Sequence, residues 1–151
     1  CTSIGGIPGA APPLIGWAAV SGDLATPAWV LFALMFVWQP AHFWALAIVR
    51  KEEYARAGLP MLPVVRGDDV TRKRMLWWNL ALLPVSLLPA VFGVAGTLYL
   101  ATAIVMGAWY FWRTVQFVRA PEVSADQARR LFFLSIFYLF AVFVAVFVDA
   151  R

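Results

Sequence analysis

The residues that could do chemistry are concentrated between positions 38 and 63, which read WQPAHFWALAIVRKEEYARAGLPMLP. This segment holds the only histidine, His42, and the adjacent acids Glu52 and Glu53. An ionisable side chain inside an apolar helix is costly and marks a functional site by default. Carboxylates bind Mg²⁺, which also takes phosphate oxygens as ligands. Together these residue types indicate a site for a long substrate with an apolar body and an anionic head.

The spacing predicts that these residues line one face of a helix. His42 lies eight residues before Arg50, about 12 Å inside the basic end of its helix. Eleven residues separate His42 from Glu53, so the two share a face about 16 Å apart if the helix is continuous. Gln39 shares that face, three residues before His42. Two structural alternatives stay open: a histidine bonded to a neighbouring helix, and a solvated helix end at Glu52.

Basic residues beside the acidic pair add positive charge for the same anion. Lys51 and Arg56 are suited to a phosphate-bearing substrate. The run Arg-Lys-Arg at 72–74 is instead predicted to anchor a helix end at anionic lipid. Asp68 and Asp69 are typical of a helix start. The sequence contains no glycine-rich phosphate loop, zinc-protease motif or nucleophile elbow, which argues against those enzyme classes.

The composition is that of a protein in a lipid bilayer. Hydrophobic residues make up 63% of the 151 positions and charged residues only 13%, against about a quarter in soluble domains. The sole cysteine, Cys1, excludes an internal disulfide and a cysteine metal site. The net charge of +4 comes from residues that border apolar segments, so it indicates membrane topology and not nucleic-acid binding.

We predict an all-α fold, a polytopic transmembrane helical bundle with five spans in this chain. The first span is rich in glycine and proline and should be a kinked packing helix. Pro40 should kink the second span, and Pro84 and Pro89 the third. The second helix is expected to continue to Ala57, with Gly58 at its C-terminal turn. The five spans are residues 4–20, 28–49, 75–92, 97–117 and 131–148.

Two polar loops set the predicted orientation. Loops 50–74 and 113–130 carry eleven of the twelve lysines and arginines, and two spans separate them, so both lie on one side. The positive-inside rule then places both loops in the cytoplasm, with the protein in a bacterial inner membrane.

Three sequence blocks resemble the protohaem IX farnesyltransferases (haem O synthases), a branch of the UbiA-type intramembrane prenyltransferases. The blocks are Gly5-Gly6 with PPLIGW at 12–17, PAHFWAL at 40–46, and EYARAGLPMLPVV at 53–65. The resemblance is dense over residues 1–75 and rests on hydropathy beyond them. It implies a bundle of about nine spans with a cavity open to the cytoplasm.

The resemblance also implies an activity. A farnesyl group would pass from farnesyl diphosphate to a vinyl group of protohaem IX (haem b), and water would complete the side chain of haem O. Mg²⁺ would neutralise the diphosphate leaving group. Implied partners are the lipid bilayer and, by analogy alone, a haem A synthase or a terminal oxidase.

Site residues follow from the same resemblance. His42 would face the haem, and Glu53 matches an acidic position of the family that is usually Asp followed by Tyr. The implied catalytic residues are His42, Lys51, Glu53 and Tyr54; the substrate-binding residues are Gln39, His42, Lys51 and Arg56; and the metal-binding residues are Glu52 and Glu53.

Two departures from the family pattern matter. Glu53 stands where Asp is commoner, which changes the reach of the carboxylate by one methylene. The family's first acidic motif, Asn-x-x-x-Asp-x-x-x-Asp, does not occur in these residues. We therefore expect residues 1–151 to be one transmembrane prenyltransferase domain that is truncated at its N-terminus and inactive alone.

Two other functions stay open at this point. A UbiA-type prenyltransferase with a quinone-precursor or chlorophyllide acceptor is the nearer one, although the blocks at 40–46 and 53–65 argue against it. A membrane transporter or assembly subunit is the other, because broken helices and an intramembrane histidine also suit transport.

Overall fold

The computed structural model describes residues 2–150, and nearly all of them lie in helices or the short turns between them. Within this range the only strand-like pairing is an isolated bridge between Ala95 and Ala150. The predicted all-α fold class is therefore confirmed. The helices are α1 Thr2–Ala10, α2 Pro12–Ser21, α3 Thr26–Val49, α4 Lys51–Arg56, α5 Leu62–Arg66, α6 Asp68–Val85, α7 Leu88–Val91, α8 Thr97–Arg119 and α9 Ala125–Val148.

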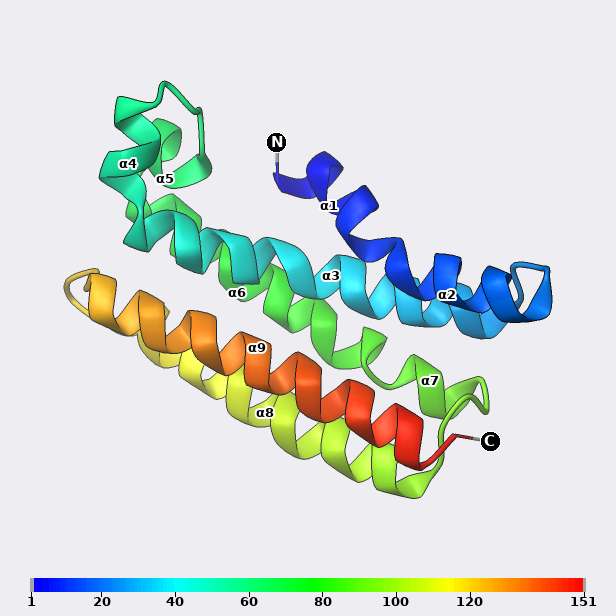
Figure 1. Ribbon diagram of the computed structural model, residues 1–151. Coiled ribbons are helices and arrows are strands. Elements are labelled where there is room, and N and C mark those ends of the chain that lie inside the picture. The colour runs from blue at the N-terminus through cyan, green and yellow to red at the C-terminus, as the bar shows by residue number, and fades with distance from the viewer. Residues whose placement is uncertain (1, 151) are drawn as a thin grey trace.

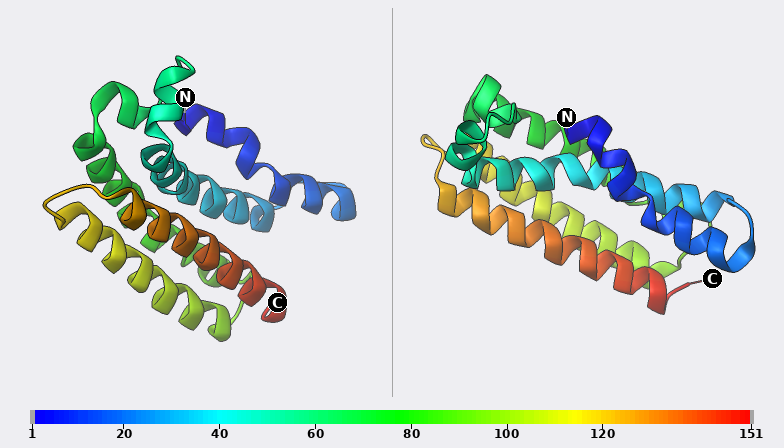
Figure 2. Two further views of the ribbon diagram at one scale, coloured as in Figure 1. Left: turned by 60° about the vertical axis from the view of Figure 1, so that its left-hand side comes forward. Right: turned by 45° about the horizontal axis from the view of Figure 1, so that its top comes forward.

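Four long helices, α3, α6, α8 and α9, form the bundle (Figure 1). In ring order, α3 packs on α6, α6 on α8, α8 on α9, and α9 back on α3. The short helices α1 and α2 lie against α3, while α4 and α5 cover one end (Figure 2). The buried core between the long helices includes Leu34, Met75, Tyr99, Tyr110 and Tyr138. Helix α3, which carries His42, is therefore part of the bundle, and α4 packs against α3 and α5 at its end.

Three of the five predicted spans are long and apolar enough to cross a membrane, counting the described residues alone: Thr26–Val49, Asp68–Val91 and Ala125–Val148. Helix α8 has 23 residues, about 34 Å of rise, but its tyrosines, tryptophans and threonines make it less apolar. The first predicted span, 4–20, is divided into α1 and α2 at Ala11. The break occurs because Pro12 and Pro13 open α2, where a missing N–H costs nothing.

The predicted continuation of the second helix to Ala57 is wrong. Helix α3 ends at Val49, and Arg50 takes φ −105° and ψ 24°, outside the helical region. A separate helix, α4, follows and ends before Gly58, whose φ of 67° is that of a C-terminal turn glycine. Arg50 still donates its N–H to Leu46, so the chain changes direction with little loss of backbone bonding.

The predicted kink at Pro40 and the predicted kinks at Pro84 and Pro89 have different outcomes. Pro40 lies inside α3, which continues through it without a break. The third span is interrupted between α6 and α7, and Pro84 and Pro89 flank that interruption as predicted.

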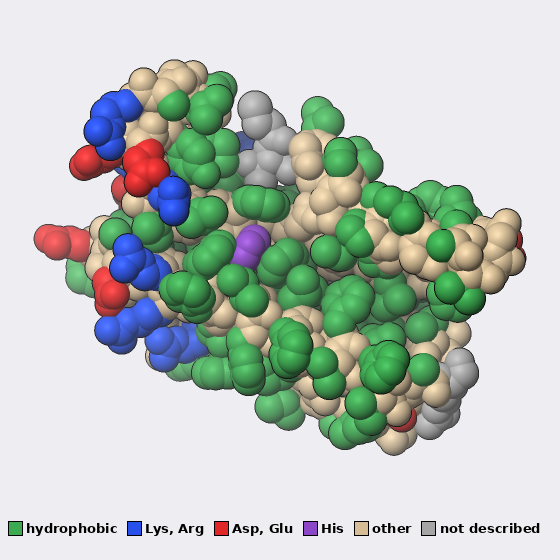
Figure 3. Space-filling view, viewed as in Figure 1, with side chains coloured by type: hydrophobic (Ala, Val, Ile, Leu, Met, Phe, Trp, Pro, Cys, Tyr) green, Lys and Arg blue, Asp and Glu red, His purple; other side chains and the backbone are tan. Residues whose placement is uncertain are grey.

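The two predicted polar loops are largely helical. Segment 50–74 contains α4, α5 and the first turns of α6, which begins at Asp68 as its acidic first turn predicted. In segment 113–130 only residues 120–124 lie outside α8 and α9. The charged ends of these helices project beyond the apolar core, so they are polar like loops, and this is why the sequence predicted loops there. Both segments lie at one end of the bundle, where charged side chains gather (Figure 3).

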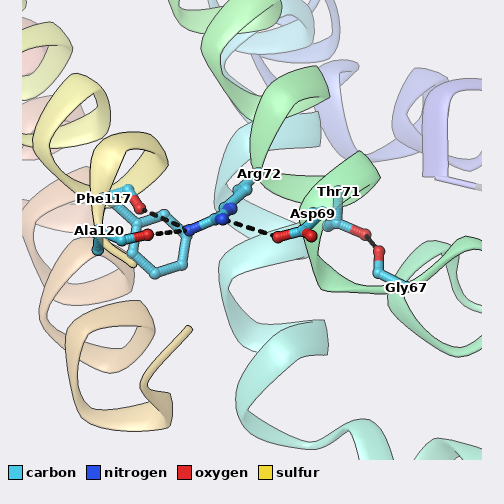
Figure 4. A network of polar contacts seen from close by, with 6 residues as sticks. All are labelled: Gly67, Asp69, Thr71, Arg72, Phe117 and Ala120. Atoms are coloured by element: carbon cyan, nitrogen blue, oxygen red, sulfur yellow. Dashed lines mark hydrogen bonds and ion pairs between the residues drawn. The ribbon is translucent and has the colours of Figure 1, made fainter. Parts of the chain in front are cut away.

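Arg72 joins the start of α6 to the end of α8 (Figure 4). Its guanidinium donates to the carbonyl oxygens of Ala120 at 2.6 Å and Phe117 at 3.5 Å, and pairs with Asp69 at 2.7 Å. The last carbonyls of a helix lack partners in the helix and favour a nearby cation. Arg72 is only 12% exposed, so it stabilises the bundle. The prediction that Arg72 anchors a helix end at lipid is therefore wrong.

Replacing Arg72 with alanine should lower the free energy of unfolding by about 2 kcal/mol, because charged hydrogen bonds to the partly buried end of α8 are lost. Lys73→Ala, a neighbouring exposed cation, is the matched control and should change stability little. Thermal unfolding in detergent measures both. Equal effects of the two substitutions would contradict a structural role for Arg72.

Candidate functional site

His42 lies in the middle of an aromatic stack between α3 and α9. Its ring stacks on Trp38 at a centroid distance of 4.3 Å and on Phe132 at 4.6 Å, both with interplanar angles of 21°. Phe43 approaches its edge at 5.4 Å. Rings on both faces fix the plane of the imidazole, so its two nitrogens point in defined directions.

Ser135 on α9 fixes which nitrogen of His42 is protonated. The Ser135 hydroxyl donates to the carbonyl of Phe132 at 2.6 Å, and His42 Nδ1 lies 2.6 Å from the same hydroxyl oxygen. A hydroxyl has one proton to donate, so Nδ1 carries the hydrogen in its own bond to Ser135. Nε2 is then left with a lone pair. Trp38 Nε1 holds the same turn of α9 by donating to the Ser135 carbonyl at 2.9 Å.

This contact bears on the alternative that His42 is a structural histidine bonded to a neighbouring helix. The histidine does bond a neighbouring helix, but this bond uses only Nδ1. His42 is half-buried, and in Figure 3 the purple histidine reaches the surface between the charged end and the apolar body. Nε2 is the ring nitrogen left for a ligand.

Gln39 is buried against α1, one turn before His42. Its side chain is packed against two glycines of α1: a Cβ on Gly6 would lie 2.8 Å from Gln39 Oε1, and one on Gly9 2.7 Å from Nε2. Gln39 is 3% exposed, and its Oε1 has no hydrogen-bond partner among the described residues. Glycine at both positions lets α1 approach α3 closely enough to hold this amide.

Gly9→Ala is predicted to lower stability by about 1 kcal/mol, because the new methyl group displaces a buried amide. The cost should largely disappear when Gln39 is also replaced by alanine, since the two groups are in contact. Gly5→Ala is the control, because a Cβ there meets nothing within 4 Å. Thermal unfolding of these three variants and of Gln39→Ala alone tests this, and equal costs at Gly5 and Gly9 would refute the contact.

The charged residues of the predicted site are paired with neighbours or open to solvent. Lys51 Nζ lies 3.1 Å from Asp68 at the start of α6, and Glu53 lies 3.1 Å from Arg50. Glu52 and Arg56 are exposed, and Tyr54 is half-buried. These residues share one end of the bundle, but the break at Arg50 removes the continuous helix that was to align Glu53 with His42.

An apolar groove of about 410 Å³ begins at the His42 stack. Trp38, which stacks on His42, also lines this groove. Its walls come from α2, α3 and α9, and they consist of Pro12, Pro13, Met35, Trp38, Ile136, Leu139, Phe140 and Phe143. An apolar groove with one polar, oriented histidine beside it suits a hydrophobic substrate that reacts at one point.

No group of three or more His, Cys, Asp or Glu side chains that could hold a metal ion occurs among residues 2–150. A complete protein cage for Mg²⁺ is therefore not formed by this part of the chain. Glu52 and Glu53 are both exposed on α4, and Mg²⁺ needs only one or two carboxylates when water and substrate phosphates supply its other ligands.

Sequence reasoning missed Ser135 and Phe132, which complete the environment of His42. Ser135 is the only serine or threonine in α9, and a lone hydroxyl in an apolar span is the signal that could have identified it. Its partner could not have been named from the sequence, because 93 residues separate Ser135 from His42.

A family model described as the UbiA prenyltransferase family matches residues 1–137. Curated relatives are named protoheme IX farnesyltransferase: that of Thiobacillus denitrificans is 51% identical over 148 residues, and that of Gloeobacter violaceus 47% over 147. Each match covers 97% of this chain and 48% of the relative. The chain thus spans about half the length of the curated relatives it matches.

The fold has a counterpart among solved structures. A digeranylgeranylglyceryl phosphate synthase superposes with a TM-score of 0.84 at 17% identity, over 97% of this chain and 51% of that one. At this identity the likeness shows the fold alone. Since the family model covers most of the residues, the chain belongs to the UbiA prenyltransferase family.

Proposed function

We propose that this chain is part of a protohaem IX farnesyltransferase, which transfers the farnesyl group of farnesyl diphosphate to a vinyl group of protohaem IX. The observation that carries the proposal is an oriented histidine between an apolar groove and a charged end of the bundle. Relatives of that name, 47% to 51% identical, support the choice of acceptor.

The reaction breaks one bond of farnesyl diphosphate and forms two on the vinyl group. The C1–oxygen bond breaks, and diphosphate leaves with the bonding electrons. The π electrons of the vinyl group form the bond between its terminal carbon and the farnesyl carbon, and the oxygen of water then bonds to the electron-deficient inner carbon with loss of a proton. The products are haem O, diphosphate and a proton. Charge develops on the leaving diphosphate, so that is where stabilisation matters most.

The charged helix α4 supplies groups for the diphosphate. Lys51 and Arg56 provide positive charge, and Glu52 and Glu53 would hold Mg²⁺, which when bound neutralises the phosphate oxygens. Tyr54, next to Glu53, would donate a hydrogen bond to the same group. The ion pair of Glu53 with Arg50 lies between side chains that are more than half exposed, so opening it to bind substrate costs little.

His42 acts on the acceptor. A lone pair on His42 Nε2 makes this atom an acceptor or ligand toward the haem, because Nδ1 is already bonded to Ser135. The buried Gln39 oxygen without a partner is a second polar group one turn away. The apolar groove beside Trp38 would hold the farnesyl chain.

The location follows from the charge distribution. We propose that the end bearing α4 and the loop 120–124 faces the cytoplasm of a bacterium, because the basic residues gather there. Haem O formed in the bilayer would pass to a haem A synthase or a terminal oxidase.

The nearest alternative is a prenyltransferase with another acceptor, such as a quinone precursor or chlorophyllide. A competition experiment measures which acceptor the enzyme prefers. The purified complete gene product is given farnesyl diphosphate together with protohaem, a quinone precursor and chlorophyllide, and the prenylated products are separated by chromatography. Prenylation of protohaem alone supports the proposal, whereas preference for another acceptor overturns it. A transporter or assembly subunit is disfavoured because the matching family is one of prenyltransferases.

A further inference from the structure

A second pocket, of about 450 Å³, lies between α8 and α9 near their charged ends. It shares no residue with the apolar groove or with the contacts of His42. Arg113 and Arg130 line it together with Gln116 and Gln127, above an apolar wall that includes Trp109 and Leu134. The pocket is thus polar and basic on one side and hydrophobic on the other.

The pocket carries unbalanced positive charge. Arg130 pairs with Asp126 at 3.0 Å, and both side chains are largely exposed. Arg113 forms no ion pair or hydrogen bond within the described part of the chain. It lies six residues before the end of α8, about 9 Å inside the helix terminus. Its side chain is exposed, so the guanidinium is open to an anion from outside the chain.

We propose that this pocket binds the headgroup phosphate of an anionic phospholipid, with one acyl chain along Trp109 and Leu134. Guanidinium groups bind phosphate oxygens through paired hydrogen bonds, and the two glutamine amides add neutral donors. The apolar wall favours a lipid over free phosphate, because it buries hydrocarbon continuous with the headgroup. The pocket lies at the basic end, where anionic lipids of a cytoplasmic leaflet would meet it.

The test uses the purified complete gene product in nanodiscs or detergent with phosphatidylglycerol or phosphatidylcholine, and retained lipid is measured by native mass spectrometry. Arg113→Gln and Arg130→Gln should each reduce the preference for phosphatidylglycerol about fivefold. Arg129→Gln removes the same charge next to Arg130 but outside the pocket lining, and should leave the preference intact. Arg113→Lys should retain part of the preference for phosphatidylglycerol, because lysine keeps the positive charge but lacks the planar guanidinium group that forms paired hydrogen bonds.

Three outcomes would overturn the proposal. One is equal loss of preference in the Arg129 and Arg113 variants, which would indicate a diffuse surface charge. Another is a wild-type protein with no preference between the two lipids. The third is displacement of phosphatidylglycerol by inorganic phosphate at equal concentration, which would show that the pocket recognises phosphate without the lipid. None of these depends on farnesyl transfer, so the lipid site and the proposed enzyme can fail separately.

Discussion

Replacing His42 with alanine in the complete gene product should lower haem O formation at least about a hundredfold, the scale of losing a group that positions the reacting substrate. The imidazole is held on both faces by aromatic rings and at Nδ1 by Ser135, so only Nε2 remains to meet the acceptor. The rate of haem O formation by purified enzyme, at matched protein levels, measures the effect.

Ser135 provides the matched comparison for this prediction. Ser135→Ala removes the partner of His42 Nδ1 and should reduce the rate about tenfold, because the ring loses its fixed tautomer. Ser135→Thr keeps the hydroxyl and should restore most of the rate. Nitrogen NMR of labelled histidine reports the protonated nitrogen directly. A wild-type rate in His42→Ala, or an Nε2–H tautomer in the wild type, would contradict this assignment.

Neutralising Glu53 should be the second most damaging change. Glu53→Gln is expected to lower the apparent affinity for Mg²⁺ and kcat/KM for farnesyl diphosphate by about tenfold to a hundredfold. Its present partner, Arg50, does not hold the carboxylate strongly, because both side chains are more than half exposed. Titration of activity with Mg²⁺ at fixed farnesyl diphosphate measures the change.

Glu122→Gln is the control for Glu53. It removes the same charge at the same end of the bundle, from an exposed residue in the loop between α8 and α9. Its Mg²⁺ dependence should match that of the wild type, and Glu52→Gln should resemble Glu53→Gln if the two acids share one ion. If Glu122→Gln and Glu53→Gln weaken Mg²⁺ dependence equally, the effect is general electrostatics and the assigned site is wrong.

The helices were predictable where apolar runs of membrane length are bounded by charge or proline. The apolar span 28–49 was predictable because Arg50 and Lys51 follow it at once, although the helix itself was expected to continue to Ala57. The interruption near Pro84 and Pro89 was also predictable from proline chemistry. The break at Arg50 was not, since no glycine or proline marks it and the next residues, Lys-Glu-Glu, favour a helix.

The site was predictable in its residue types but not in its contacts. His42 stood out as the only histidine in an apolar span, and the acids as the only adjacent glutamates. The partners of His42 and Arg72 come from other helices, and helical periodicity within one segment says nothing about which helices meet. Composition likewise mistook the charged ends of α6, α8 and α9 for loops, because charge excludes a residue from lipid but not from a helix.

The central claim is that the complete protein makes haem O with His42 at the acceptor. The most direct measurement expresses the complete gene product in a bacterial host that lacks its own haem O synthase, then separates the extracted haems by reversed-phase chromatography. We predict a later-eluting haem O peak from the wild type that disappears in His42→Ala at equal expression. Haem O that persists in His42→Ala would remove the histidine from the site, and no haem O from a well-expressed wild type would contradict the proposed function.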